Sequence, residues 1–150
     1  MELSLVPQTH DYDEAIFREY TDDIAKFMDT PSFSCLEQVV AQTEIFSKQR
    51  ELGIDRLYVI TDPNGLFLGQ VILANIQAEF PEIGIWVSKS YQQQGIATQA
   101  IQQLRIINPD LSKKLFSYPV KKENTASIAL AIKLNPKTVK NENDCLVFYL

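Results

Sequence analysis

The sequence is poor in the residues that build metal centres and disulfide frameworks, with two cysteines and one histidine among 150 residues. Cys35 and Cys145 lie far apart and show no metal-ligand spacing, so we expect two buried or half-buried thiols and no metal. Basic residues are also few, 14 against 19 acidic ones, and the net charge of −5 argues against a nucleic-acid binder. An acidic chain instead favours a cationic partner or substrate.

Long apolar runs and processing signals are missing as well. No apolar stretch approaches the roughly 20 residues that span a bilayer. The segment Met1-Glu2-Leu3-Ser4 lacks the basic start and apolar stretch of a secretion signal, so we expect a cytoplasmic protein with no membrane partner. No linker or internal repeat divides the chain, and its length suits one domain over residues 1–150.

Hydrophobic periodicity predicts a chain in which strands and helices alternate. The helix expected over residues 11–28 contains a possible break at Thr21-Asp22-Asp23, and Ser34-Cys35-Leu36-Glu37 has the pattern of a capping box. The element order predicts a mixed α/β sheet that is antiparallel at first and has a parallel pair in the middle. Strands are expected over residues 1–6, 56–60, 66–74, 81–88, 114–120 and 145–150, and further helices over residues 36–53, 92–106 and 124–134.

Residues 82–98 carry the clearest chemical signal, because a strand leads there through a tight turn into a helix that opens at Gly95. Backbone N–H groups at a helix start are unpaired and, together with the helix dipole, make an anion site. Gly95 has no side chain and Ala97 a small one, so a phosphate can approach closely. A purely structural turn fits the same pattern, as does a nucleotide-binding module, although no P-loop lysine or Gly-x-Gly-x-x-Gly is present.

Three motifs in order resemble those of the GNAT acetyltransferases. Gln92-Gln93-Gln94-Gly95-Ile96-Ala97 resembles the family's acetyl-CoA motif, which is Gln or Arg, two residues, Gly, one residue, then Gly or Ala. Residues 82–87 look like its central strand, and Glu123-Asn124-Thr125-Ala126-Ser127 is similar to the Asn-x-x-Ser of the branch that acetylates ribosomal-protein N-termini and related amines. The resemblance runs from about Thr21 to the end.

The resemblance implies a fold and a reaction. The fold would be the GNAT fold, a mostly antiparallel sheet flanked by helices, whose central strand bulges away from its parallel neighbour and leaves a gap for pantetheine. The reaction would be direct attack of a primary amine, on a small molecule or a peptide, on the thioester of acetyl-CoA. The cofactor-binding residues would be Trp86, Val87, Gln92, Gln93, Gln94, Gly95, Ile96, Ala97, Thr98, Asn124 and Ser127.

Direct attack requires a neutral amine, whose pKa when lysine-like is roughly 10.4, so a base must remove a proton at neutral pH. Glu82, at the start of the central strand, is the candidate base, and Glu79 is a nearby substitute. Ser127 is the candidate acid or water-holder beside the thiol, and a backbone N–H near Val87 would stabilise the thioester oxygen. A solvated carboxylate at Glu82 and an ordinary first-turn serine at Ser127 are the structural alternatives.

Other residues carry weaker signals. Trp86 is expected in the core or at the border of the acceptor pocket, and His10 at the surface or at a helix cap. The chain departs from the family in having no Gly-Phe after its last helix and no tyrosine within it. A non-catalytic CoA-binding or scaffolding member of the fold is therefore the alternative. In either case a monomer or a dimer is expected. An acidic run would be a solvated helix face or the entrance for a cationic acceptor: Asp11, Asp13, Glu14, Asp22 and Asp23.

Overall fold

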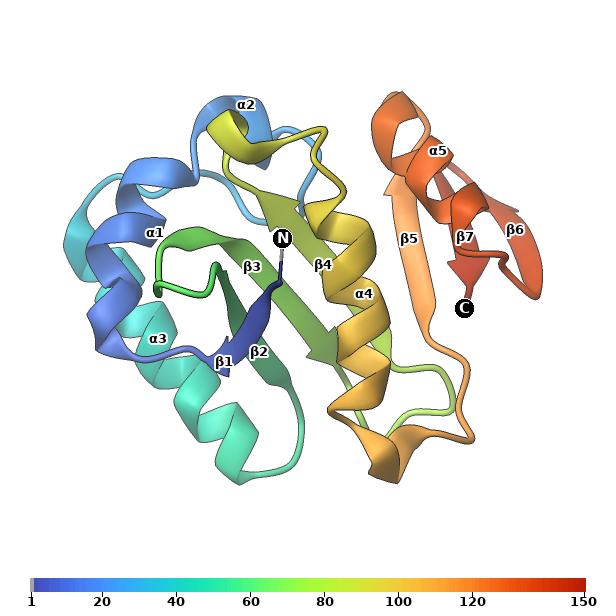
Figure 1. Ribbon diagram of the computed structural model, residues 1–150, viewed down its shortest axis with the longest axis horizontal. Helices are drawn as coiled ribbons and strands as arrows, with labels where there is room; N and C mark the ends of the chain where they lie inside the picture. Colours follow the sequence, from blue (N-terminus) through green and yellow to red (C-terminus); the bar gives the residue numbers. More distant parts are fainter. Residues whose placement is uncertain (1) are drawn as a thin grey trace.

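A seven-stranded mixed sheet forms the centre of the computed structural model, which describes residues 2–150 (Figure 1). Its strands are β1 (Ser4–Pro7), β2 (Arg56–Thr61), β3 (Phe67–Ala74), β4 (Glu82–Val87), β5 (Ser117–Lys121), β6 (Thr138–Glu142) and β7 (Cys145–Tyr149). The helices are α1 (Asp13–Glu19), α2 (Asp22–Ala25), α3 (Leu36–Glu51), α4 (Ile96–Ile106) and α5 (Thr125–Lys133), with short 3-10 turns η1 (His10–Tyr12), η2 (Lys89–Tyr91) and η3 (Pro109–Leu111).

The strand order confirms the predicted mixed sheet. It is β1-β2-β3-β4-β5-β7-β6, and every pairing is antiparallel except that of β4 with β5. Within the described chain, β4 and β5 share one register pair, Glu82 with Ser117. The two parallel strands therefore meet at their N-terminal ends and diverge toward their C-terminal ends, which is the splay that the resemblance implied.

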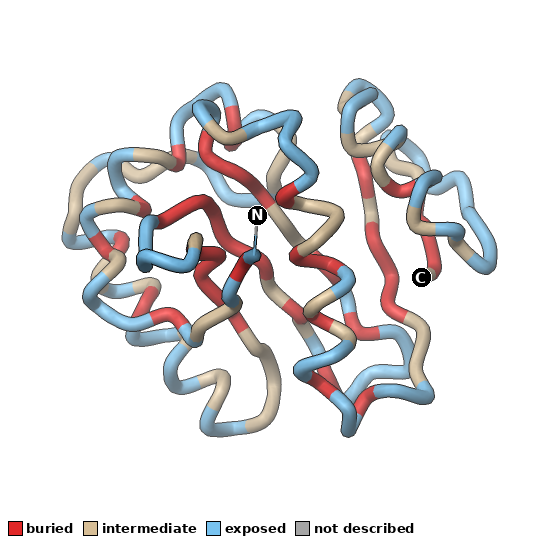
Figure 2. Tube along the Cα trace, in the orientation of Figure 1, coloured by how far each residue is buried: buried red, intermediate tan, exposed pale blue. Residues whose placement is uncertain are grey.

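The sheet is covered on both faces, because its strands place alternate side chains on opposite sides. One core lies under α4 and α5 and includes Ile83 and Val87 of β4, whereas the other lies under α1 and α3 and includes Trp86. The burial-coloured trace shows the central strands mostly buried and the outer turns exposed (Figure 2). Among residues 2–150, no helix is both long and apolar enough to cross a membrane.

Two predictions about the N-terminal helices have different outcomes. The break at Thr21 is confirmed, since α1 ends at Glu19 and α2 begins at Asp22. The capping box at Ser34 is wrong. Cys35 occupies the N-cap position without a side-chain hydrogen bond, and the Ser34 N–H instead donates to Gln38 Oε1 at 2.8 Å. The side chain that accepts from the Ser34 N–H is thus Gln38, one residue after the Glu37 that the pattern indicated.

Three further predictions are corrected by the backbone. Residues 92–94 are not helical, because Gln93 has a φ of 63° and Gly95 one of 77°, so α4 begins at Ile96. The bulge expected in β4 is absent: Glu82 to Val87 pair continuously with β3, and the register shift lies between Ile60 and Thr61 of β2. The strand β6 was missed because it is a polar edge strand, exposed at every position, that shows no hydrophobic alternation.

Candidate active site

The turn before α4 presents a row of backbone N–H donors. Gly95 is the N-cap residue, in the left-handed conformation, and a Cβ built on it would meet nothing within 4 Å. The Gln99 N–H closes the first helical bond on Gly95 O at 3.1 Å, so the N–H groups of Ile96, Ala97 and Thr98 have no intrahelical acceptor. These donors and the helix dipole favour an anion at this point.

Neighbouring side chains hold this turn in place. Gln92 Nε2 donates to Val87 O at 3.1 Å, which ties the turn to the end of β4. Ile96 is buried in the core, whereas Gln93 and Gln94 are exposed. Of the predicted cofactor residues, Gln92 therefore holds the turn against the end of β4 with its side chain. Gln93 and Gln94 lie at the surface of the turn.

The splay between β4 and β5 exposes backbone donors of β4. The Ser88 N–H donates to Leu68 O of β3 at 2.8 Å. Because donors alternate in direction along an antiparallel strand, the N–H of Val87 points away from β3 and toward β5. Beyond Glu82 and Ser117, β5 offers no register partner within residues 2–150. The Val87 N–H thus faces the widening gap, where it was predicted to meet a thioester oxygen.

The start of α5 lies at the same end of the parallel pair, directly after β5 (Figure 1). Asn124 is its N-cap residue as predicted, and its Oδ1 accepts from the Ser127 N–H at 3.3 Å. Ser127 also hydrogen-bonds to Tyr118, a buried residue of β5. Burial raises the pKa of the Tyr118 phenol, and the hydrogen bond from Ser127 acts in the opposite direction.

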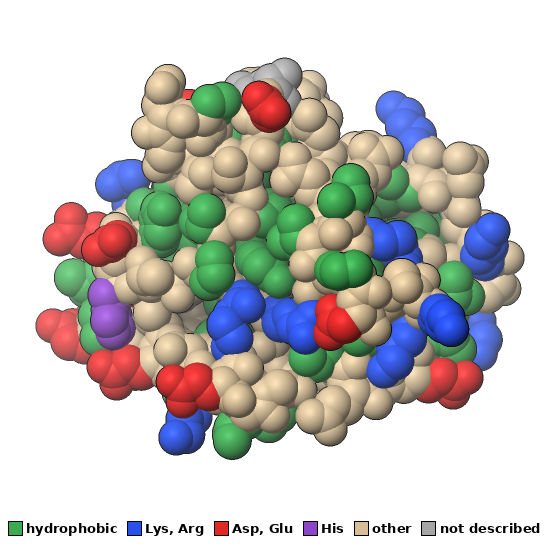
Figure 3. Space-filling model, turned by 60° about the horizontal axis from the view of Figure 1, so that its bottom comes forward, with side chains coloured by type: hydrophobic (Ala, Val, Ile, Leu, Met, Phe, Trp, Pro, Cys, Tyr) green, Lys and Arg blue, Asp and Glu red, His purple; other side chains and the backbone are tan. Residues whose placement is uncertain are grey.

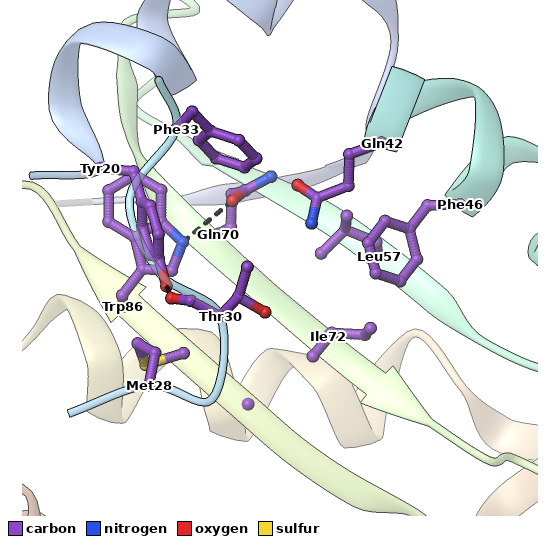
Figure 4. Close-up of a pocket in the computed structure, with 11 residues that line it drawn as sticks. Tyr20, Met28, Thr30, Phe33, Gln42, Phe46, Leu57, Gln70, Ile72 and Trp86 are labelled. Atoms are coloured by element: carbon purple, nitrogen blue, oxygen red, sulfur yellow. Dashed lines mark hydrogen bonds between the residues drawn. The ribbon is translucent and has the colours of Figure 1, made fainter. Parts of the chain in front are cut away.

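A small aromatic pocket lies on the other face of the sheet, under the segment that follows α1 (Figure 4). Trp86 forms one wall and packs edge-on against Tyr20, with ring centroids 5.1 Å apart. The Trp86 Nε1 donates to Gln70 Oε1 at 2.9 Å, and the Tyr20 hydroxyl donates to Thr30 O. The other lining residues are Met28, Phe33, Gln42, Phe46, Leu57, Ile72 and Gly84.

The predicted base lies on the strand face that forms this pocket. Since alternate residues of a strand share a face, Glu82 is on the same side as Gly84 and Trp86, whereas Glu79 lies before the strand. Partial desolvation of the Glu82 carboxylate, which still keeps contact with solvent, followed by the charge of Asp29, raises its pKa. At about 3.4 Å per residue, Glu82 and Val87 are roughly 17 Å apart along β4. The Glu82 carboxylate therefore cannot contact a group bound near Val87, and a proton would have to reach it through a relay of several waters.

Asp11, Glu14, Asp22 and Asp23 of the acidic run are exposed, as a solvated face would be, and only Asp13 differs from that prediction. Asp13 is buried, not solvated, and accepts hydrogen bonds from His10 and Thr43. Asp22 accepts from the Ser32 hydroxyl, and Asp23 pairs with Lys89 at 3.3 Å. The carboxylate beside the pocket is instead Asp29, between the lining residues Met28 and Thr30.

Sequence reasoning missed three residues of this site. Asp29 belongs to no motif, and only folding brings it near Glu82. Tyr118 lies on β5 and not on the following helix, where a tyrosine was sought. Gln70 supports Trp86 from the neighbouring strand, and its position is readable only from the pairing of Gln70 with Trp86 in the sheet.

Comparison with known proteins identifies the family. Residues 2–135 match the family model described as the acetyltransferase (GNAT) domain. No curated protein sequence matches the chain. The chain belongs to the GNAT acetyltransferases, as the three motifs indicated.

Solved structures share the fold at low sequence identity. One is RimL, a ribosomal alpha-N-protein acetyltransferase, in complex with coenzyme A (TM-score 0.84, 19% identity, 98% of this chain and 92% of that one). Another is the microcin self-immunity acetyltransferase MccE with acetyl-CoA and AMP (TM-score 0.82, 21% identity, 99% and 91%). A third is spermidine N-acetyltransferase from Vibrio cholerae with CoA and spermine (TM-score 0.77, 15% identity, 98% and 92%).

Proposed function

We propose that this protein transfers the acetyl group of acetyl-CoA to a cationic primary amine that binds in the aromatic pocket. The observation that carries the proposal is the arrangement around β4. The strand ends at the donor row of α4 and at the open gap beside β5, while its other face forms a pocket with two carboxylates nearby. A GNAT domain with CoA-bound structural neighbours supports the choice of acetyl-CoA.

The cofactor would occupy the gap between the parallel strands. Its pyrophosphate would rest on the N–H groups of Ile96, Ala97 and Thr98, where Gly95 leaves open space. Its pantetheine arm would replace the missing β5 partner of β4. The thioester oxygen would then accept a hydrogen bond from the Val87 N–H, which stabilises the charge that develops during attack.

Glu82 would prepare the acceptor. An ammonium group entering near Asp29 and Glu82 would lose a proton through water to the Glu82 carboxylate. The neutral nitrogen would attack the carbonyl carbon, and collapse of the tetrahedral intermediate would break the carbon–sulfur bond. The products are the N-acetylated amine and CoA, with the departing sulfur protonated by Ser127, whose hydroxyl lies in hydrogen-bond contact with the Tyr118 phenol.

A thiol-release assay with acetyl-CoA and a panel of amines tests this proposal. The panel should hold peptide N-termini, polyamines, aminoglycosides and small amino compounds, each compared with its N-methylated or N-acetylated analogue. Release of thiol with a primary amine and not with its blocked analogue is the expected result. The absence of turnover with every amine, together with measurable CoA binding, would favour the scaffolding alternative.

A further inference from the structure

A chain of buried polar side chains connects the aromatic pocket to the opposite side of α3. The Trp86 Nε1 donates to Gln70 Oε1 at 2.9 Å, and Gln70 Nε2 donates to Gln8 Oε1. Gln8 Nε2 then donates to Thr43 Oγ1 at 2.8 Å. These residues come from β4, β3, the segment after β1 and α3, and all of them are buried.

The chain ends on a carboxylate. The Thr43 hydroxyl donates to Asp13 Oδ1 at 2.5 Å, and His10 Nδ1 lies 2.6 Å from Asp13 Oδ2. A carboxylate only accepts and an indole N–H only donates, so the donors run in one direction from Trp86 to Asp13. This single direction determines the orientation of both glutamine amides, and the charge at the end strengthens the bonds before it.

We propose that Gln8 and Gln70 are positioning residues that hold the indole of Trp86 as a wall of the acceptor pocket, an inference that rests on the proposed function. Gln70 and Trp86 both line the pocket, whereas Gln8 does not. Without the bond to Gln70, the indole keeps its packing against Tyr20 and Phe67 but loses the polar contact that selects one ring orientation. Gln8 acts one step further back, since it determines which way the Gln70 amide faces.

Replacing Gln8 by Met tests whether Gln8 influences Trp86 through Gln70, because Met keeps the length of the side chain and removes its hydrogen bonds. Trp86 is the chain's one tryptophan, so intrinsic fluorescence reports on it directly. We expect altered emission and greater quenching by acrylamide in Gln8→Met. We also expect the acceptor KM to rise about tenfold, equivalent to one buried hydrogen bond, with the KM for acetyl-CoA unchanged.

Four further variants separate positioning from general destabilisation. Gln70→Met should show the same phenotype. The double variant should be no worse than Gln70→Met alone, because both substitutions interrupt the same series of hydrogen bonds. Thr43→Val tests the link beyond Gln8 and serves if Gln8→Met does not fold. Asn108→Leu is the matched control, since Asn108 is equally buried but bonds Arg56 and Tyr58 under the other face of the sheet. It should lower stability without moving the fluorescence of Trp86.

The outcomes distinguish this inference from the proposed function. Unchanged Trp86 fluorescence in the folded Gln8 and Gln70 variants would overturn the inference whether or not the protein turns over an amine. Altered fluorescence with an unchanged acceptor KM would overturn the role in acceptor binding. An equal rise in both KM values would show a general structural effect and would also overturn it. If no amine is acetylated by the parent protein, the proposed function fails, and the fluorescence comparison still decides whether the chain orients Trp86.

Discussion

Glu82 of β4 lies opposite Ser117 of β5, in the one register pair that joins these parallel strands within residues 2–150. This pair sets the closed end of the gap, while the donors of α4 and the start of α5 lie at its open end. The candidate base and the candidate cofactor site are therefore at opposite ends of the same short strand. Changes at the two ends should have separable effects on acceptor chemistry and on CoA binding.

The first prediction concerns the turn before α4. Gly95→Ala should weaken CoA binding by about tenfold or more, because the new methyl group occupies the open space at the helix start. Gly65→Ala is the matched control, since Gly65 has a similar φ of 84° and equally open surroundings in the β2–β3 turn. Both variants pay a similar strain of roughly 1–2 kcal/mol for a left-handed alanine. Calorimetry that finds equal CoA affinities in the two would show that the phosphate binds elsewhere.

The second prediction concerns Glu82. Glu82→Gln should lower kcat by about 10²–10⁴-fold, as expected for a positioned base, and leave the KM for acetyl-CoA near the parent value. Glu82 must be deprotonated to act, so activity should rise with pH through its pKa, which lies above 4.5 because of burial and Asp29. The variant should lack this acidic limb. Near-parent turnover in Glu82→Gln, with a large loss in Glu79→Gln, would transfer the role to Glu79.

The third prediction concerns the charge at the pocket entrance. Asp29→Asn should raise the acceptor KM roughly 2- to 5-fold at low salt and reduce its dependence on ionic strength, as for an exposed charge pair. The same substitution should bring the acidic limb of the pH profile closer to 4.5, since Asp29 contributes to the raised pKa of Glu82. The double variant Asp22→Asn/Asp23→Asn is the control, because those carboxylates already bond Ser32 and Lys89. An acceptor KM that depends equally on ionic strength in the parent, in Asp29→Asn and in the double variant would contradict a cationic acceptor.

The fourth prediction concerns the pH dependence of stability. The hydrogen bond with Asp13 raises the pKa of His10, and the charges of Asp13, Glu44 and Asp11 act in the same direction. Acidic side chains gather around the histidine at one edge of the molecule (Figure 3). The stabilisation from protonated His10 should therefore be complete below about pH 6.5, the unfolded value, and be lost as the pH rises through the raised folded pKa.

Chemical denaturation of the parent and of His10→Gln between pH 5.5 and 8.5 measures this contribution. The difference in unfolding free energy should be largest at the acidic end and shrink steadily as the pH rises. A difference that does not change with pH would show that the His10–Asp13 contact carries no linked proton.

The sequence predicted those local structures of the candidate site that depend on neighbouring residues. Two patterns are short in sequence: a glycine before a helix, and an Asn three residues before a Ser. The structure has the glycine turn and the Asn124 cap where they were expected. The exact start of α4 was not readable, because the left-handed conformation of Gln93 is set by the turn as a whole and not by its residue type.

Long-range relationships were beyond sequence reasoning. Gln8 and Gln70 are 62 positions apart, and their hydrogen bond depends on β1, β2 and β3 pairing in one register. Asp29 had no motif to mark it, and its influence on Glu82 comes from the path of an irregular segment. The polar strand β6 pairs with β7 but is exposed at every position, so its side chains left no periodic hydrophobic signal.

The splay between β4 and β5 also affects how the molecule unfolds locally. Residues 117–150 form their own antiparallel array of β5, β7 and β6. The single register pair at Glu82, side-chain packing and a few hydrogen bonds, such as that from Arg105 to Leu150 O at 2.9 Å, join this array to the rest. Such a segment has the character of a cooperative unit that opens before the whole protein unfolds, with its amide hydrogens exchanging together. A cofactor bound in the gap would contact both β4 and β5 and so hold the two parts together. Its binding free energy would then appear as slower amide hydrogen exchange across the entire C-terminal array.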